Sequence, residues 1–228
     1  MTILDDKKVS GFATRAKSAW ARGMIWWHYQ KRVRENSDIH EHLPYLRELA
    51  RNCESICEMG VRRCVSSWAF LLGLAESPRP DKALFCVDIQ PAELHPLIHL
   101  GAALLPAVQA SMTVADSRSF HLPREVDLLF IDTLHVYGQL KQELSAHQAR
   151  VRSFLCLHDT ETDGEEGEVV RMGWDVQQMA TETGLTPRDL RRGLRPAIQE
   201  FLEAFPQWQR HRHFPNNNGL TVLRRRNT

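Results

Sequence analysis

The sequence lacks the features that mark membrane, secreted and nucleic-acid-binding proteins. Among its 228 residues, no stretch approaches the roughly 18 consecutive apolar residues of a membrane span. The first residues are polar and charged, so we expect no secretion signal. The 29 Lys and Arg nearly balance the 28 Asp and Glu, whereas non-specific nucleic-acid binding depends on a basic excess. We therefore expect a cytoplasmic protein with a small-molecule substrate, and neither nucleic acids nor membranes as partners.

Cysteine is scarce, and its spacing is not that of a metal or redox motif. There are five cysteines, an odd number, and none forms a CxxC pair. Cys57, Cys86 and Cys156 lie in or beside apolar runs, where cysteine behaves as a small hydrophobic residue. We interpret them as reduced, buried thiols rather than as a redox pair or zinc ligands.

Residues 1–36 combine aromatic and basic side chains in a pattern that favours a helix. Aromatic residues among cations also occur in nucleic-acid-binding proteins. We favour packing of Trp20, Trp26 and Trp27 on a neighbouring element or a second subunit, with the charges in solvent. The chain is therefore expected to form a homo-oligomer.

Two parts of the chain are expected to differ in organisation. Residues 1–50 are predicted to form an N-terminal helical extension, and residues 51–228 the main domain. Asp38 is a candidate N-cap for a second helix, whose leucines share one face.

From about residue 55, short apolar runs alternate with helical patterns, which is typical of βαβ units. The expected strands are 55–59, 83–89, 107–114, 126–132 and 153–158. The expected helices are 65–75, 93–104, 136–150 and 194–205. Near the end, 207–214 and 219–224 flank an Asn-rich turn and are predicted to form a hairpin. The sequence thus predicts an α/β protein with an open, mostly parallel sheet, an antiparallel C-terminal hairpin and helices on both faces.

An insertion, residues 160–193, separates the last parallel strand from the last helix, and its first part is acidic. Its acidic residues are Glu161, Asp163, Glu165, Glu166 and Glu168. One interpretation is a solvated loop. The other is a lid over the active site, which supplies oxygen ligands or attracts a cationic substrate. The sequence leaves both open.

Candidate site residues follow the strands, because ligands of open α/β sheets bind beyond the carboxyl ends of the strands. Glu58 ends the first strand, and Gly60 allows a close turn into the next helix. Asp88 is suited to accept both hydroxyls of a ribose, and Asp116 with Ser117 suits an adenine edge. Taken alone, each acid is more often a helix cap or a turn residue than a ligand contact. Their order on successive strands is more informative.

The fourth and fifth strands end in acids that can converge on one divalent cation. These acids are Asp132 and Asp159, and His135 is placed to take a proton from a nucleophile held beside Asp132. The structural alternatives are helix caps and a histidine hydrogen-bonded under the next helix. His158 can share a cation with Asp159 only if the strand has ended there, since neighbouring strand residues face opposite sides.

At these residues the chain resembles the class I S-adenosylmethionine-dependent methyltransferases. The similarity is to their small-molecule O-methyltransferase branch, of the cephamycin-biosynthesis and macrolide-sugar type. It runs from about residue 38 to residue 224 and is best over three segments: 56–67, 130–137 and 157–160. The most specific part is an Ile-Asp pair, two further residues, a His and then a Tyr nearby. The resemblance implies the Rossmann-like sheet of that class.

The resemblance also implies roles for individual residues. Contacts with S-adenosylmethionine are implied for Glu58, Gly60, Ser66, Asp88, Asp116 and Ser117. Ligands of a divalent metal, magnesium or manganese, are implied at Asp132, His158 and Asp159. Catalytic roles are implied for Asp132 and for His135, which looks like the general base.

Two departures from the family pattern concern these residues. The metal-dependent relatives typically have Glu where this chain has His158. This departure has two interpretations. Either the imidazole shifts the preference of the site toward manganese, iron or zinc, or the metal binds weakly or is absent. Cys64 stands where many relatives have glycine, which affects the details of the cofactor loop.

The reaction that the resemblance implies is direct displacement. A hydroxyl, most simply one of a metal-bound vicinal pair, attacks the sulfonium methyl while His135 takes its proton. A second interpretation is a metal-dependent lyase, oxygenase or cyclase on the same fold, with His135, His158 and one Asp as ligands. A third is an RNA methyltransferase, motivated by the basic N-terminal helix and the arginines at 224–226. The near-zero net charge and the acidic insertion speak against RNA.

Overall fold

The computed structural model describes residues 3–90, 96–105 and 108–226, with side chains from residue 16 onward except that of residue 97. Seven strands form one sheet in the order β3-β2-β1-β4-β5-β7-β6. Their bounds are β1 (Ser55–Met59), β2 (Lys82–Asp88), β3 (Val108–Val114), β4 (Val126–Ile131), β5 (Val151–His158), β6 (Trp208–Phe214) and β7 (Leu220–Arg225). Strands β1 to β5 pair in parallel, and β7 pairs antiparallel with both β5 and β6. The predicted mostly parallel sheet with a C-terminal hairpin is confirmed.

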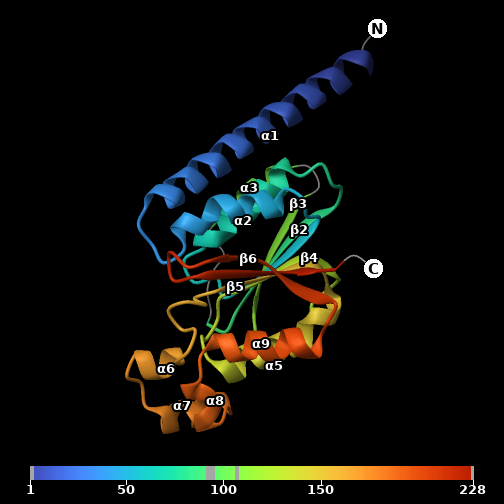
Figure 1. Cartoon of the computed structure of the whole chain (residues 1–228). Coiled ribbons are helices and arrows are strands. Elements are labelled where there is room, and N and C mark those ends of the chain that lie inside the picture. Colours follow the sequence, from blue (N-terminus) through green and yellow to red (C-terminus); the bar gives the residue numbers. More distant parts are fainter. Residues whose placement is uncertain (1–2, 91–95, 106–107, 227–228) are drawn as a thin grey trace.

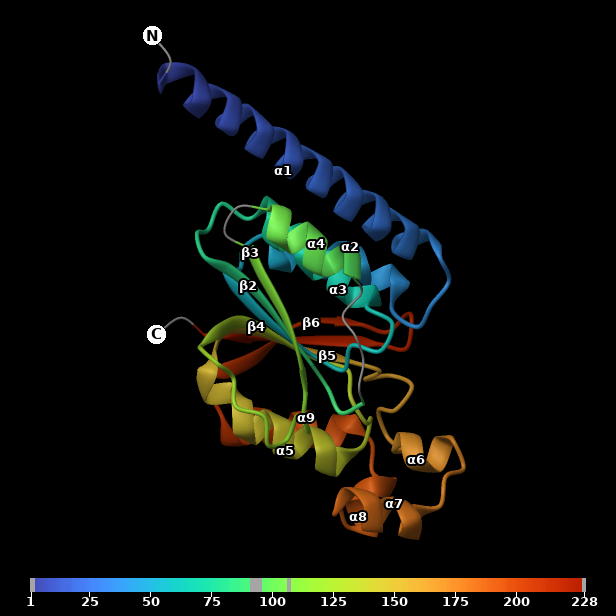
Figure 2. The same ribbon diagram turned by 180° about the vertical axis from the view of Figure 1, so that it is seen from behind.

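Helices cover both faces of the sheet, which is confirmed too (Figures 1 and 2). One face carries α2 (Leu43–Ala50), α3 (Val65–Glu76) and α4 (Pro96–Leu104), and the other carries α5 (Tyr137–His147) and α9 (Leu194–Ala204). Side chains of β1 alternate between the two cores: Ile56 joins the core under α3, and Cys57 joins the core under α5. Burial on both faces explains why this strand is rich in apolar residues, namely Ile56, Cys57 and Met59. All five cysteines lie among the described residues, are buried and form no disulfide.

Most predicted elements differ from the structure by two residues or fewer at their ends. Residue 107 of the third predicted strand and residues 93–95 of the second predicted helix lie outside the described residues. The helix predicted over 136–150 is shorter, because α5 is followed by a 3-10 turn, η2 (Gln148–Arg150). Such a turn takes up the last backbone groups of a helix before the chain changes direction.

The predicted capping role of Asp38 is wrong. A 3-10 turn, η1 (His40–His42), precedes α2, whose N-cap residue is His42 and whose second residue is Pro44. Proline suits this position because its fixed φ is helical and its missing N–H is not needed there. Asp38 instead contacts the loop after β1, with its Oδ2 2.8 Å from Nη2 of Arg62.

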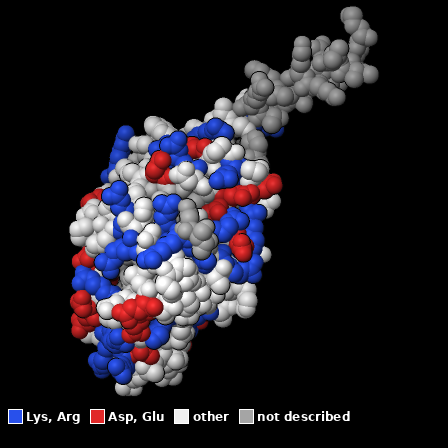
Figure 3. Space-filling model, turned by 45° about the vertical axis from the view of Figure 1, so that its right-hand side comes forward, with Lys and Arg blue, Asp and Glu red and all other residues white. Residues whose placement is uncertain are grey.

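The predicted N-terminal helix is confirmed as α1 (Ile3–Arg34), which packs outside α3 and α4 and extends beyond the body of the protein (Figure 1). Its packed side carries Ala21, Ile25 and Tyr29, which are buried and four residues apart. None of the described helices is long and apolar enough to cross a membrane. On the face shown in Figure 3, basic and acidic side chains are interspersed.

The insertion forms three short helices beyond the carboxyl ends of the parallel strands (Figure 1). They are α6 (Glu168–Arg171), α7 (Val176–Thr183) and α8 (Pro187–Arg191). A small apolar cluster holds them to the start of α5; its buried members are Val136, Val169, Leu185 and Leu190. The insertion is therefore packed against the body rather than a loop surrounded by solvent.

The three tryptophans of α1 lie on its exposed side, and their exposed fractions are 55% for Trp20, 49% for Trp26 and 56% for Trp27. Large exposed aromatic groups on one helix favour association, so we predict that the chain forms a homo-oligomer through this side. Light scattering is expected to give a multiple of the chain mass, and Trp20→Ala with Trp27→Ala to lower it to one chain. Trp174→Ala, at an exposed tryptophan of the insertion, is the control. A single-chain mass for the unmodified protein would contradict the prediction.

Candidate active site

The site begins at the turn after β1, where two strand ends meet. Gly60 has a φ of +85°, and a Cβ at this position would collide with the backbone carbonyl of Asp132. The N–H of Gly60 donates to the Val87 carbonyl at 2.9 Å, and the N–H of Asp132 donates to the Met59 carbonyl at 2.9 Å. Only glycine allows this conformation and this approach together, so Gly60 brings the ends of β1, β2 and β4 to one point.

The loop after Gly60 is held by Asp88 at the end of β2. Its Oδ2 accepts from the N–H groups of Val61 at 2.9 Å and Arg62 at 3.1 Å. Arg62 and Cys64 both have positive φ, at 43° and 56°. Cys64 thus adopts the left-handed conformation that glycine takes most easily, despite its side chain. The carboxylate of Asp88 thus holds the backbone of this loop in place through two hydrogen bonds.

A cavity of about 780 Å³ opens beyond β1, β2, β3 and β4. Four of the predicted cofactor-binding residues line it together: Gly60, Asp88, Asp116 and Ser117. A further part of its lining comes from α7 of the insertion, by Met179, Glu182 and Thr183. The volume lies in the range of cofactor sites. Sequence reasoning missed α7 because nothing in its residues marks a contact with β3.

Asp116 is held in this cavity by an arginine that the sequence analysis did not single out. Hydrogen bonds from the Arg118 side chain lower the pKa of Asp116. Burial acts in the opposite direction but is outweighed, so this pKa lies below its usual value. Arg118 also donates to the Thr183 carbonyl at 2.8 Å. This arginine therefore joins the strand end at Asp116 to the last residue of α7.

Two predicted cofactor residues lie elsewhere. Glu58 is fully buried beneath the turn, where it accepts hydrogen bonds from the hydroxyls of Ser66 and Ser67 and from the thiol of Cys86. Burial raises the pKa of Glu58 to about 7. Ser66 lines a second, smaller cavity. Contacts of Glu58 and Ser66 with a cofactor stay predictions.

The second cavity, of about 210 Å³, lies on the other side of the turn. Its lining includes acids from four segments: Asp38, Asp132, Asp159 and Glu168. It shares Gly60, Arg62, Asp132 and Thr133 with the larger cavity. The two cavities therefore meet at the turn between β1 and β4.

The structure brings together the three predicted metal ligands. Strand β5 ends at His158, and Asp159 has a φ of +57°, so the two neighbouring side chains turn toward the same point. Nδ1 of His158 lies 3.1 Å from Oδ1 of Asp132 and 3.4 Å from Oδ1 of Asp159. One ligand atom from each residue lies within 4.8 Å of the others. Metal binding by this group stays a prediction.

His135 lies among four carboxylates. Its Nε2 is 3.1 Å from Asp132, and its Nδ1 is 3.1 Å from Asp159, 3.2 Å from Glu168 and 3.6 Å from Asp163. Burial disfavours its charged form, but the contacts with Asp132 and Glu168 outweigh burial and raise the pKa of His135 well above its usual value. Two acids of the insertion thus belong to the site.

The acids around His135 also contact other charged groups. Asp163 is fully buried and is held by Arg171, with Nη2 2.9 Å from Oδ2. Burial raises the pKa of Asp132, but the contacts with His158 and His135 outweigh it and lower this pKa. The sequence marks Asp163 and Glu168 only as members of an acidic stretch. Which acids of the stretch reach His135 depends on the path of the insertion.

No family model and no curated protein sequence matches the chain. Among solved structures, it is similar to cofactor-bound Rv0187 from MTB, with a TM-score of 0.56, 14% identity, and coverage of 91% of this chain and 90% of that one. N-methyltransferase NodS from Bradyrhizobium japonicum WM9 aligns with a TM-score of 0.52 and 12% identity, over 85% of this chain and 99% of NodS. NodS in complex with S-adenosyl-L-homocysteine gives 0.51 and 12%, over 88% and 98%. The chain has the fold of the class I S-adenosylmethionine-dependent methyltransferases.

The buried acid beneath the turn predicts a pH dependence of stability. Between pH 4.5 and about 7, folded Glu58 keeps a proton that the unfolded chain has released, so the free energy of unfolding falls as pH rises. Such a shift corresponds to about 3 kcal/mol. In Glu58→Gln we expect this contribution to the pH dependence of the free energy of unfolding to be lost. Denaturant unfolding measured from pH 4.5 to 8 gives that free energy. Glu203→Gln, at an exposed position, is the control. Parallel curves for Glu58→Gln and the unmodified protein would refute the role of Glu58.

The contact of Glu168 with His135 predicts a measurable change in the histidine. Because the carboxylate stabilises the charged imidazole, Glu168→Gln is expected to lower the pKa of His135. An NMR titration of the imidazole in the presence of a chelator measures this pKa. Glu166→Gln, an exposed acid two residues away, is expected to leave it unchanged. Equal values for all three proteins would show that Glu168 does not act on His135.

Proposed function

We propose that the protein is an S-adenosylmethionine-dependent methyltransferase that acts on a hydroxyl of a small molecule, such as a natural product or a sugar. The observation that carries the proposal is the meeting of the two cavities at Gly60, Arg62, Asp132 and Thr133. A cofactor in the larger cavity and an acceptor in the smaller one have their reacting groups at this junction. Methyl transfer needs that arrangement, because the cofactor supplies an activated methyl group and the protein supplies alignment.

The carboxylates that line the larger cavity and the fold around it are both suited to S-adenosylmethionine. Asp88 and Asp116 provide carboxylates at two of the strand ends that line it. The similar solved structures include methyltransferases, one of them with S-adenosyl-L-homocysteine. The smaller cavity, of about 210 Å³, has room for a small polar acceptor.

Asp132 at the junction, together with His158 and Asp159 beside it, fits a divalent metal. Oδ1 of Asp159 is buried and has no hydrogen-bond partner among the described residues, although it lies 3.4 Å from the His158 ring. A buried acceptor without a partner is costly, and a cation relieves that cost. Asp132, His158 and Asp159 would hold the metal, a donor set that suits manganese better than magnesium. Bound there, the metal supplies positive charge that lowers the pKa of an acceptor hydroxyl.

His135 provides the base in this proposal. Its Nδ1 is buried, has no hydrogen-bond partner among the described residues, and lies 3.1 Å from Asp159 and 3.2 Å from Glu168, two carboxylates whose charge favours a proton on that nitrogen. A cation held by Asp132 and Asp159 would offset the charge of these carboxylates and lower the pKa of His135, which would leave Nε2, beside Asp132, able to take the proton of the hydroxyl. Asp132 orients the ring at the junction and faces both cavities.

Calorimetric titration tests the proposal. Metal-stripped protein is expected to bind one S-adenosylmethionine per chain. Manganese is expected to bind as well, and Asp159→Asn to weaken the metal at least about tenfold while leaving cofactor affinity nearly unchanged, because Asp159 does not line the larger cavity. Glu166→Gln is the matched control for the acidic stretch. Failure to bind S-adenosylmethionine with or without metal would refute the methyltransferase proposal. Unchanged manganese affinity in Asp159→Asn would refute the metal site alone.

A further inference from the structure

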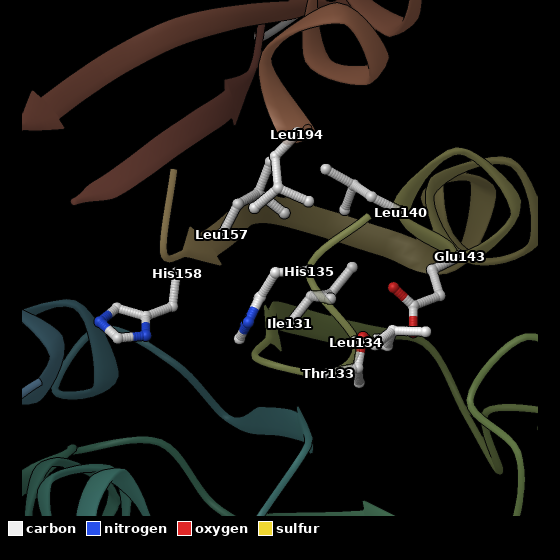
Figure 4. Close-up of a pocket in the computed structure, with 9 residues that line it drawn as sticks. All are labelled: Ile131, Thr133, Leu134, His135, Leu140, Glu143, Leu157, His158 and Leu194. Atoms are coloured by element: carbon white, nitrogen blue, oxygen red, sulfur yellow. Dashed lines mark hydrogen bonds between the residues drawn. The ribbon is translucent and has the colours of Figure 1, made fainter. Parts of the chain in front are cut away.

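Glu143 in α5 is fully buried and lies behind the wall of the larger cavity, not in its lining. Its Oε1 accepts hydrogen bonds from the hydroxyl of Ser117, from Oγ1 of Thr133 at 2.8 Å and from Nε2 of Gln139 at 2.8 Å. Figure 4 shows its carboxylate directed toward Thr133. One oxygen atom therefore anchors side chains that follow β3, follow β4 and belong to α5.

The three anchored side chains all line the larger cavity. Each hydroxyl has a single hydrogen, and Ser117 and Thr133 both donate theirs to Glu143, so their oxygens have only lone pairs left. Nε2 of Gln139 donates to Ser117 at 3.1 Å as well as to Glu143, and these two bonds use both amide hydrogens of Gln139. Its carbonyl oxygen is what remains. The side chains of this part of the wall can accept hydrogen bonds from a ligand but cannot donate.

We propose that Glu143 sets the base specificity of the cofactor cavity by keeping this part of the wall free of donors. An acceptor wall suits the exocyclic amino group of adenine and disfavours the carbonyl oxygen that hypoxanthine has in its place. The inference rests on the proposed function, which places the cofactor in this cavity. Asp116 adds a carboxylate to the lining, and its oxygens are bound by Arg118. Glu143 acts through its neighbours, so it is a positioning residue.

The test compares two ligands that differ only in the base. Calorimetry gives the affinities for S-adenosylhomocysteine and S-inosylhomocysteine. The unmodified protein is expected to prefer the adenosyl ligand by about tenfold or more. In Glu143→Gln, the carboxamide donates to Ser117 or Thr133 and turns a hydroxyl hydrogen toward the cavity, so the preference is expected to fall at least about threefold. Glu203→Gln, an exposed glutamate hydrogen-bonded to Gln199, is the matched control and is expected to keep it.

A second variant keeps the test valid if Glu143→Gln does not fold. Ser117→Ala removes one acceptor of the wall without changing Glu143, and it is expected to lower the preference in the same direction. A purely structural role would weaken both ligands equally, which overturns the inference, as does equal affinity of the unmodified protein for both. If the unmodified protein binds neither ligand, the proposed function itself fails. The ratio of affinities therefore separates the two failures.

Discussion

The close contact between the turn at Gly60 and the backbone of Asp132 is the constraint on which the site depends. The glycine lets β1 end against β4, and the hydrogen bonds on both sides of the contact lock the two strand ends in register. Asp88 then directs the following loop, and Glu58 holds the first serines of α3 from below. One cavity lies on each side of this contact. Without it, the two cavities would have no common wall.

The electrostatics of the smaller cavity follow from packing several acids around two histidines. Burial opposes the charge on every one of these groups, and their mutual contacts offset that cost. The contacts with His158 and His135 keep the pKa of Asp132 lowered, and those with Asp132 and Glu168 keep the pKa of His135 raised. Asp159, with burial as the dominant influence, has a raised pKa. Asp132 after β4 and Asp159 after β5 thus have pKa values shifted in opposite directions although their oxygens lie within 4.8 Å of each other, an arrangement typical of functional sites.

The sequence predicts the sheet well because burial on both faces leaves a local mark. Strands β2 and β4 are mostly apolar and end at or just before an acid, which identifies Asp88 and Asp132 as strand-end residues. The metal-ligand group depends on a condition that can be stated but not decided from sequence: β5 must end at His158, and the positive φ of Asp159 fulfils it. Local patterns fail where distant segments decide the outcome.

Three parts of the site show that limit. Asp38 has the composition of a helix cap, yet its partner is Arg62, 24 residues away. The contact of Arg118 with Thr183 spans 65 residues and depends on how the insertion folds back. Glu143 reads as one more polar residue of an amphipathic helix. In the structure its buried carboxylate accepts hydrogen bonds from hydroxyls that follow two different strands, and helical periodicity does not reveal such partners.

The buried cysteines have a consequence for the chemistry of the folded chain. All five are enclosed, and burial raises the pKa values of Cys53, Cys57, Cys86 and Cys156. Thiolates are the species that react with alkylating agents and oxidants, so these sulfur atoms are protected twice, by access and by protonation. Three of them lie in β1, β2 and β5, at the centre of the sheet. Alkylation of these thiols thus measures how often the sheet opens, and the chain carries its own reporter of that event.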